Sequence, residues 1–430
     1  MSSTRIQSVS AMRVWDSRGR PTVEAEVRLD DGSHGRAIAP AGASTGSGEA
    51  VDLRDGGDAL GGRDVQRAVA NVRGEIAQTL RGVDAGDQGA VDALLCRLDG
   101  SDNKARLGAN ATVAVSMATA HAAAAAAGVP LWRHLAGDRD VILPLPEIQI
   151  FGGGAHAGGR IDVQDFMVVA PGAESFDQAL VWTAEVYAAA GQLLEAEGRL
   201  RGVADEGGYW PEFSSNEEAL EYLLRAIEAA ALRPLDQVAI ALDIAATEFG
   251  EQGRYTLSLD GDELDSDAFI ERLAAWIARY PIVSVEDPLA EDDEEGLRDF
   301  TARFGDRLQI VGDDYLVTNA ARVAHAADIG ACNAVLIKPN QAGTLSEARR
   351  ALDASRDAGW GAIVSARSGE SEDTTIVDLA IGWGVSQLKV GSFARSERMA
   401  KWNEVLRIES ALGGRARFAG AAALVGRRSR

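Results

Sequence analysis

The feature that constrains this chain most is a series of short apolar runs, each of which is followed by a charged residue. Runs such as 282–285 and 334–337 are rich in valine, isoleucine and leucine, and amphipathic stretches such as 219–232 and 269–280 lie between them. This alternation predicts buried strands separated by helices. The charged residues that end the runs are Asp243, Glu286, Asp313, Lys338, Arg367 and Lys389.

The spacing of these charged residues favours a barrel. From Glu286 to Lys389 they follow one another at intervals of 22 to 29 residues, which is the length of one strand, one helix and two loops. In a (β/α)₈ barrel the carboxyl ends of the strands share one face, where the active site lies. A single charged residue after a strand is usually a solvated loop position, but six in register predict that three acids and three bases converge.

The first part of the chain has a different pattern. Strand-like alternation over 23–29 leads into a turn at 30–32, and helical patterns follow from 65 to 135. The alanine-rich run 118–127 ends at a glycine and is typical of a buried helix. Because 430 residues are too many for one ordinary core, we expect a smaller α+β domain over residues 1–137 and an α/β barrel over residues 138–430.

Charge and cysteine content exclude several classes of partner. The formal net charge of −22 disfavours nucleic acid and anionic membranes. The two cysteines, Cys96 and Cys332, form no CxxC motif, and no uninterrupted apolar run reaches the length of a membrane span. The amino-terminus lacks a basic segment followed by an apolar one. We therefore expect a cytoplasmic protein with reduced thiols.

Three of the charged residues after strands predict a metal site. Carboxylates brought together without a cation repel one another and shift each other's pKa. Carboxylate oxygens are hard ligands, and Mg²⁺ prefers such ligands. We therefore expect Mg²⁺ between Asp243, Glu286 and Asp313.

Nine stretches of the sequence resemble the enolase family and follow that family's order along nearly the whole chain. They begin at Trp15, Ala41, Leu107, Asp205, Ser284, Gln309, Asn340, Arg367 and Ala394. The resemblance implies an enolase-type barrel with an amino-terminal α+β domain. It also implies a Mg²⁺-dependent lyase that acts on a small phosphorylated carboxylic acid and assembles as a homodimer or a ring of dimers, with 13–24 and 395–407 in the subunit contacts.

The resemblance further implies roles for the matching acids and bases. Asp243, Glu286 and Asp313 are similar to the ligands of a first Mg²⁺. Lys338 resembles the general base that removes the proton α to the carboxylate, and Glu206 resembles the general acid that protonates the departing hydroxyl.

The same comparison implies a set of substrate-binding residues. Ser44, in a glycine-flanked loop, resembles the serine that closes over the site and joins a second Mg²⁺, which binds together with the substrate. Asp165 is similar to a proton-relay carboxylate beside the general acid. The residues that resemble binders of the substrate are His156, Gln164, Arg367, Ser368, Lys389 and Ser44. We expect the cations around Lys338 to lower its pKa, so that its amine acts as a base near neutral pH.

The chain departs from the family pattern around the substrate. Enolases have a histidine where this chain has Ala366, an asparagine at Gly152, a glutamate at Asp165 and a valine at Pro339. The metal ligands are kept, so the departures favour a retuned substrate over loss of function.

Three functions remain open from the sequence. The first is ordinary enolase chemistry on 2-phosphoglycerate and phosphoenolpyruvate, in a divergent paralogue. The second resembles carboxyphosphonoenolpyruvate synthase of phosphonate biosynthesis, which combines 2-phosphoglycerate with an activated phosphonoformate. The third is a scaffold that keeps only the metal site.

Overall fold

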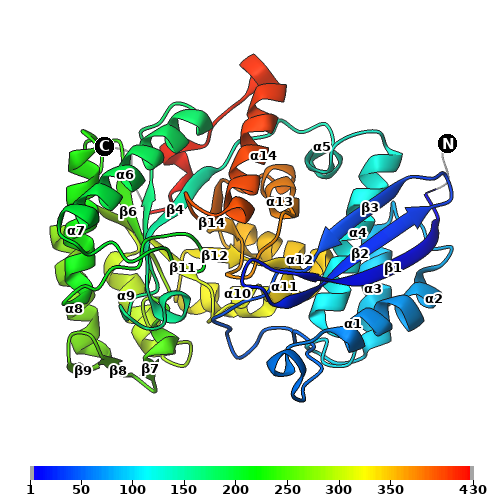
Figure 1. Ribbon diagram of the computed structural model, residues 1–430, viewed down its shortest axis with the longest axis horizontal. Coiled ribbons are helices and arrows are strands. Elements are labelled where there is room, and N and C mark those ends of the chain that lie inside the picture. Colours follow the sequence, from blue (N-terminus) through cyan, green and yellow to red (C-terminus); the bar gives the residue numbers. More distant parts are fainter. Residues whose placement is uncertain (1–3, 427–430) are drawn as a thin grey trace.

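The computed structural model describes residues 4–426, and its first part is a three-stranded sheet covered by helices (Figure 1). The antiparallel strands lie in the order β1 (Ile6–Trp15), β2 (Pro21–Leu29) and β3 (His34–Ile38). The helices are α1 (Gln66–Asn71), α2 (Ala77–Leu80), α3 (Gln88–Asp99), α4 (Ala109–Ala126) and α5 (Leu131–Ala136). The predicted strand at 23–29 and the predicted helical region from 65 to 135 are confirmed.

Helix α4 forms the centre of this part. It packs against β2 and β3, and all but a few of its residues are buried. A helix that is apolar all round is a buried one, and alanine lets neighbouring backbones approach it closely. The predicted buried helix at 118–127 is therefore the carboxyl half of α4, and Gly128, with a φ of +69°, follows it in the left-handed region.

The second part is a closed eight-stranded barrel in which the strands lie in the order β10-β11-β12-β13-β14-β4-β5-β6. The strands are β4 (Leu145–Gly152), β5 (Asp165–Val169), β6 (Ala239–Asp243), β10 (Ile282–Glu286), β11 (Gln309–Gly312), β12 (Ala334–Ile337), β13 (Gly361–Ser365) and β14 (Gln387–Ser392). A small separate sheet contains β7 (Gly250–Glu251), β8 (Arg254–Leu257) and β9 (Asp262–Asp265).

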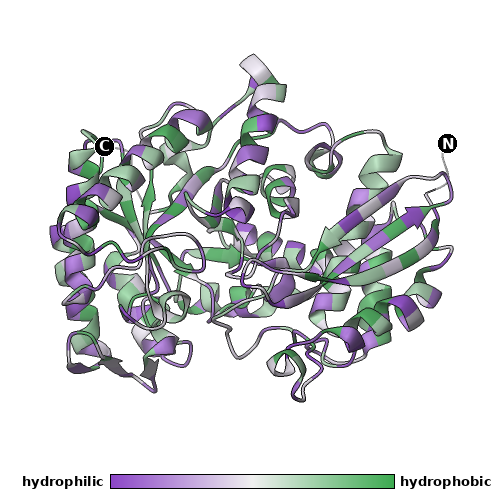
Figure 2. Cartoon of the chain, in the orientation of Figure 1, coloured by the Kyte–Doolittle hydropathy of each residue, from purple (hydrophilic) through white to green (hydrophobic). Residues whose placement is uncertain are grey.

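Helices surround the barrel. They are α6 (Phe176–Ala196), α7 (Asn216–Ala229), α8 (Ser266–Arg279), α9 (Glu294–Phe304), α10 (Ala320–Ile329), α11 (Pro339–Ala342), α12 (Leu345–Asp357), α13 (Thr375–Trp383) and α14 (Ser396–Leu412). The amphipathic patterns at 219–232 and 269–280 correspond to α7 and α8. Figure 2 shows hydrophilic stretches mainly on the outer helices and loops, as burial of the barrel strands requires.

One strand breaks the regular alternation. β5 runs antiparallel to both of its neighbours, β4 and β6, whereas the other neighbouring strands are parallel. Parallel neighbours need a crossover of a dozen or more residues, usually a helix. The link from β4 to β5 contains only a short 3₁₀ turn (Gly154–Ala157) and is rich in glycine, so it returns the chain as a hairpin. The strand–helix alternation predicted from sequence holds from β6 onward.

Hydrogen bonds join the amino-terminal part to the barrel, and one of them holds the loop 41–50 at the barrel mouth. Thr112 of α4 donates to the carbonyl of Gly343 (2.7 Å), and the Asp92 carboxylate of α3 accepts from the Ser346 backbone N–H (2.8 Å). Nearer the barrel mouth, the Ala50 N–H donates to the carbonyl of Gln341 (2.8 Å). The loop 41–50, which carries Ser44, therefore lies over the carboxyl ends of the barrel strands. The domain division predicted between 137 and 138 falls between α5 and β4.

The helices that the structure describes between residues 4 and 426 include none with the length and apolar character needed to cross a bilayer.

Candidate active site

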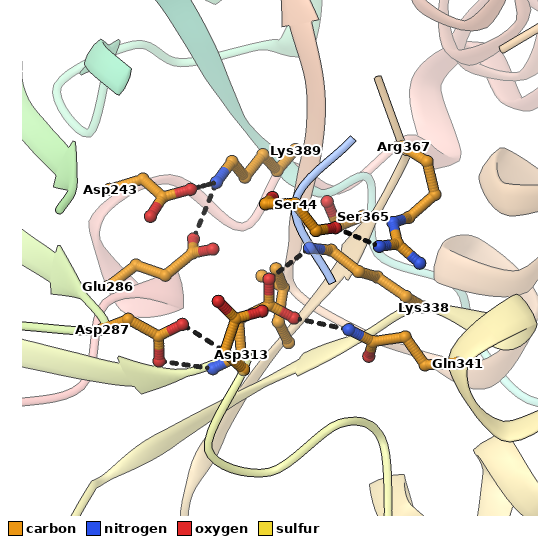
Figure 3. A network of polar contacts seen from close by, with 12 residues as sticks. Ser44, Asp243, Glu286, Asp287, Asp313, Lys338, Gln341, Ser365, Arg367 and Lys389 are labelled. Atoms are coloured by element: carbon orange, nitrogen blue, oxygen red, sulfur yellow. Dashed lines mark hydrogen bonds and ion pairs between the residues drawn. The ribbon is translucent and has the colours of Figure 1, made fainter. Parts of the chain in front are cut away.

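The predicted site residues come together at the carboxyl ends of the strands (Figure 3). One pocket is lined by Ser44, Gln164, Asp165, Glu206, Asp243, Lys338, Ser365, Ala366, Arg367, Ser368, Lys389 and Val390. Glu286 and Asp313 contact two of these residues directly, through Lys389 and Lys338. The predicted convergence of acids and bases is thus present, although the role of each residue stays a prediction.

Lys389 ties two of the acids together. Its Nζ lies 2.7 Å from Asp243 Oδ2 and 2.8 Å from Glu286 Oε2, and all three side chains are buried. Burial raises the pKa of Glu286 well above its ordinary value, and the nearby Asp243 carboxylate adds to this rise. Burial alone would lower the pKa of Lys389, but Asp243 and Glu286 raise it well above the ordinary lysine value. The ammonium of Lys389 therefore supplies the positive charge that these two carboxylates need.

The same carboxylates keep free ligand atoms. Asp243 Oδ1 and Glu286 Oε1 are buried and accept no hydrogen bond from any residue within 4–426. Buried carboxylate oxygens without a partner are costly, and a hard cation would satisfy them. With Asp313, these acids offer only oxygen ligands, which is the donor chemistry that a hard cation such as Mg²⁺ prefers.

A second group of acids lies beside this one. Carboxylate oxygens of Asp287, Asp313 and Asp314 all lie within 4.8 Å of one another. Both oxygens of Asp287 are occupied, because they accept the backbone N–H groups of Asp313 (2.9 Å) and Asp314 (2.8 Å). Asp287 therefore fixes the loop after β11 and so directs Asp313 into the site. Burial, and then the charge of Asp313, raise the pKa of Asp314 to about 8.

Lys338 follows β12 and forms a buried ion pair with Asp313. Burial lowers its pKa, and the neighbouring cations Arg367 and Lys389 lower it further, but the carboxylates of Asp313 and Glu286 together raise the pKa above the ordinary lysine value. The lowered pKa expected from sequence is therefore wrong for the protein without a metal. The expectation counted the cations around Lys338 and omitted the carboxylate that touches it.

A hydrogen-bonded network links the amino-terminal loop to these groups. Glu49 accepts from both terminal nitrogens of Arg367 (2.9 and 3.0 Å), and Arg367 also donates to the carbonyl of Ser44 (2.9 Å). Gln341 donates to Glu49 (3.1 Å) and to Asp313 (2.9 Å). Sequence analysis did not single out Glu49 or Gln341, although Gln341 lies inside one of the family-like stretches.

The loop after β13 is held from behind by α14. The fully buried guanidinium of Arg398 donates to the carbonyls of Arg367, Ser368 and Val390. Lys401 Nζ lies 3.0 Å from Glu370 Oε2, and Glu370 Oε1 accepts the backbone N–H of Arg367 (3.0 Å). Two buried cations of α14 thus position Arg367 and Ser368.

Glu206 reaches the pocket through a tight turn. Gly207 has a φ of +97°, and a Cβ at that position would lie 2.5 Å from the carbonyl oxygen of Ala394. The Glu206 carbonyl accepts the Ser392 N–H (2.9 Å), which docks the turn on the end of β14. The glycine after Glu206 therefore permits the close approach that brings this acid to the pocket.

The residues around β5 complete the site. Gln164 donates to Asp243 Oδ2 (3.0 Å), and Asp165 Oδ2 lies 3.5 Å from Lys389 Nζ. The backbone of His156 lies in the 3₁₀ turn between β4 and β5, and its side chain lies outside the described residues.

The fold and the site together are those of an α/β-barrel protein with buried carboxylates and lysines at the carboxyl ends of its strands. Residues 6–135 match the N-terminal domain of enolase, and residues 140–426 match the enolase C-terminal TIM barrel domain. The chain therefore belongs to the enolase family. At the level of the family, these domains support a lyase-type enzyme, and the buried acidic cluster is compatible with a bound metal.

Proposed function

We propose that this protein is a Mg²⁺-dependent lyase that removes the α-proton of 2-phosphoglycerate and eliminates its hydroxyl group to form phosphoenolpyruvate. The observation that carries the proposal is the presence of a lysine and a carboxylic acid, Lys338 and Glu206, in one pocket with the guanidinium of Arg367. A base, an acid and an anion-binding group are what such an elimination requires.

The chemistry needs two proton transfers. The unprotonated amine of Lys338 accepts the proton from C2, and the electrons of the C–H bond move toward the substrate carboxylate. The C3–O bond then breaks, and the departing hydroxide takes a proton from Glu206 and leaves as water. Arg367 and Ser368 bind the phosphoryl group, and Lys389 contributes positive charge near the substrate carboxylate.

The acids Asp243, Glu286 and Asp313 would hold the first Mg²⁺, and Ser44 would contribute to a second one that binds with the substrate. Mg²⁺ held there would supply positive charge that stabilises the carboxylate dianion and offsets the negative charge of the acids. Burial, Arg367 and Lys389 favour the unprotonated form of Lys338, whereas Asp313 and Glu286, two of the residues that would hold the metal, oppose it. The Ser44 loop excludes water from the site.

The test is a direct assay of the purified protein with 2-phosphoglycerate and Mg²⁺. We expect phosphoenolpyruvate to form, and we expect a chelator to stop its formation. Sustained formation after complete removal of divalent metal would contradict the Mg²⁺ requirement. The absence of both phosphoenolpyruvate formation and C2 proton exchange would leave only the scaffold hypothesis.

Ala366 favours a second candidate, a carboxyphosphonoenolpyruvate synthase-like transfer. Its methyl group lines the pocket next to Arg367, where the family resemblance places an imidazole. A methyl group is smaller than an imidazole and has no polar atom, and a 2-phosphoglycerate held less closely beside Arg367 would lose about 100-fold in rate through misplacement. An activated phosphonoformate is a partner that could occupy the place of the imidazole.

Substitution of Ala366 separates the two candidates. If the space serves phosphonoformate, Ala366→His should block its transfer and increase phosphoenolpyruvate formation, more so in combination with Asp165→Glu. Wild type and both variants are assayed side by side for the two reactions. Rapid phosphoenolpyruvate formation by the wild type that neither substitution changes would leave ordinary enolase chemistry as the function.

The assembly also stays a proposal, namely a homodimer or a ring of dimers in the cytoplasm. Met12 and Trp15 on β1 are each half exposed, which is unusual for large apolar side chains on a strand. The free thiols of Cys96 and Cys332 suit a reducing compartment. Light scattering at micromolar concentration should give at least a dimer mass, and a monomer mass would contradict the proposal.

A further inference from the structure

Gln149 of β4 links Asp165 to the turn that carries Glu206, and both acids line the pocket. Its side chain is fully buried. Its Nε2 donates to Asp165 Oδ1, and its Oε1 accepts the backbone N–H of Gly208 (2.8 Å). Gly208 belongs to the turn that carries Glu206, so one amide group connects the Asp165 carboxylate to the backbone that holds Glu206.

Two glycines make room for this amide. A Cβ at Gly208 would lie 2.4 Å from Gln149 Oε1, and a Cβ at Gly152 would lie 3.2 Å from Gln149 Nε2 and 2.8 Å from the Cβ of Ala204. Real Cβ atoms do not approach another atom as closely as 2.4 or 2.8 Å, and the 3.2 Å separation from Gln149 Nε2 is tight. The space between β4 and the Glu206 turn is therefore shaped for a long amide side chain.

The same contact accounts for two departures noted in the sequence. Asp165 carries its carboxylate one methylene closer to the backbone than the glutamate of the family pattern, and the Gln149 amide reaches it there. Gly152 stands where the family pattern has asparagine, and a larger side chain at that position would crowd the amide. Gln149, Asp165 and Gly152 thus form one packed unit.

We propose that Gln149 is a positioning residue that sets the placement of Asp165 and Glu206 and thereby controls hydroxyl elimination without affecting proton abstraction. The proposal rests on the proposed function. The base itself is held by other contacts, because Lys338 is fixed by its ion pair with Asp313 and by Thr318, whose Oγ1 accepts the Lys338 backbone N–H (2.9 Å). Asp165 also lies 3.5 Å from Lys389 through its other carboxylate oxygen, Oδ2, which Gln149 does not bond. Within residues 4–426 the side-chain hydrogen bonds of Gln149 go to Asp165 and Gly208, and not to Lys338, Asp313 or Thr318.

The experiment compares four proteins. Gln149→Asn shortens the amide, and the double variant Gln149→Asn/Asp165→Glu restores the reach by lengthening the acid. Gln387→Asn is the matched control, because Gln387 is an equally buried barrel glutamine. Within residues 4–426 its side chain bonds to Gln309 (2.7 and 3.0 Å) and to the carbonyl of Ala423 (3.1 Å), and to no acid of the pocket. Each protein and the wild type are assayed for C2 proton exchange in deuterated water and for phosphoenolpyruvate formation from 2-phosphoglycerate.

For Gln149→Asn we expect elimination to fall by about 100-fold while C2 exchange stays near the wild-type rate. The double variant should eliminate the hydroxyl at least about tenfold faster than Gln149→Asn, and Gln387→Asn should change neither rate. Equal loss of exchange and elimination, an unchanged elimination rate, or no recovery in the double variant would overturn the proposal. So would an equal loss in Gln387→Asn.

Urea unfolding of wild type, both single variants at positions 149 and 165, and the double variant separates this proposal from the proposed function. The two substitutions should be non-additive in stability, because the side chains touch. If the wild type shows neither exchange nor elimination, the proposed function fails. In that case, additive changes in unfolding free energy would show that Gln149 and Asp165 do not interact. Non-additive changes would show that they do.

Discussion

The two halves of the barrel mouth are built in different ways. On the acid half, the side chains that meet come from the strand ends themselves, namely β6, β10 and the residue after β11. On the other half, the loop after β13 that carries Arg367 and Ser368 is held by groups from elsewhere. Glu49 reaches it from the amino-terminal part, and Arg398 and Lys401 reach it from α14.

This difference indicates what each half depends on. The acid half concentrates like charges in a buried place, so it depends on a compensating cation, which is Lys389 in the described contacts and Mg²⁺ in the proposed enzyme. The other half presents backbone and guanidinium groups toward an anion, so it depends on the rigidity that its imported partners provide. Removal of a charged group should impair the acid half most, and removal of a supporting hydrogen bond should impair the other half most.

A substitution in the acid half is expected to reduce catalysis most. Glu286→Ala removes one of the two buried carboxylates that Lys389 bridges, and with it an oxygen that accepts no hydrogen bond from residues 4–426. We expect kcat to fall by at least about 100-fold with the fold retained, because the electrostatic stabilisation of the reacting dianion is lost. Steady-state kinetics and circular dichroism check this. A variant that keeps full activity would sink the assignment of this residue to the metal site.

A smaller effect, of a different kind, is expected on the other half. Arg398→Lys cannot reach all three carbonyls that the guanidinium contacts, because an ammonium lacks the forked geometry. Loss of buried hydrogen bonds should cost about 1–3 kcal/mol of unfolding free energy. We expect KM for the phosphorylated substrate to rise by about tenfold, with a smaller change in kcat.

The control for that variant is Arg407→Lys, on the same helix. Arg407 is exposed in the single chain, where it pairs with Glu404, and it ends the segment 395–407 expected in subunit contacts. Lysine keeps its positive charge, so the substitution should leave KM and stability near those of the wild type. If both variants raise KM equally, the effect belongs to the helix as a whole and the proposed difference between the halves is lost.

The sequence predicted the acid half far better than the other half. Asp243, Glu286, Asp313 and Lys338 end consecutive apolar runs, and in a parallel barrel that position alone brings them to one face. Glu49, Arg398 and Lys401 carry no such signal. They are charged residues in a loop and a helix, where the usual location is the solvated surface, and only the folded structure shows that their charged groups are buried.

Two features of the fold also lay beyond the sequence patterns. The antiparallel β5 follows from the lack of a helix between β4 and β5, which apolar periodicity in the strands does not reveal. The raised pKa of Lys338 depends on its contact with Asp313, which follows the neighbouring strand β11 and lies 25 residues away in the sequence. Both depend on which elements meet in space, which the pattern of a single segment does not determine.

The smallest expected effect is one on stability, and it concerns Asp378 of α13, which lies outside both halves. Burial, and then Glu404 and Asp373, raise the pKa of Asp378 to about 7 from 3.8, while the N–H of Trp132 opposes the rise. Because the folded protein holds this proton more tightly, stability falls as the pH rises from about 4 to about 7 and then levels off.

Asp378→Asn should remove that dependence, since the amide oxygen still accepts the Trp132 N–H and carries no charge. The variant should gain about 1 kcal/mol over the wild type for each pH unit between 4 and 7, as measured by urea unfolding. Asp357→Asn, an exposed position at the end of α12, is the control and should show no such gain. A gain that is equal at pH 4 and pH 8 would assign the effect to packing instead of proton binding.

The central claim is that Lys338 removes the proton and Glu206 assists the departure of the hydroxyl. The most direct measurement is the exchange of the C2 proton of 2-phosphoglycerate with deuterated water, with Mg²⁺ present, by Lys338→Ala and by Glu206→Gln. The account predicts that Glu206→Gln still exchanges the proton but forms little phosphoenolpyruvate, whereas Lys338→Ala does neither. Equal exchange by the two variants would contradict the assignment of base and acid.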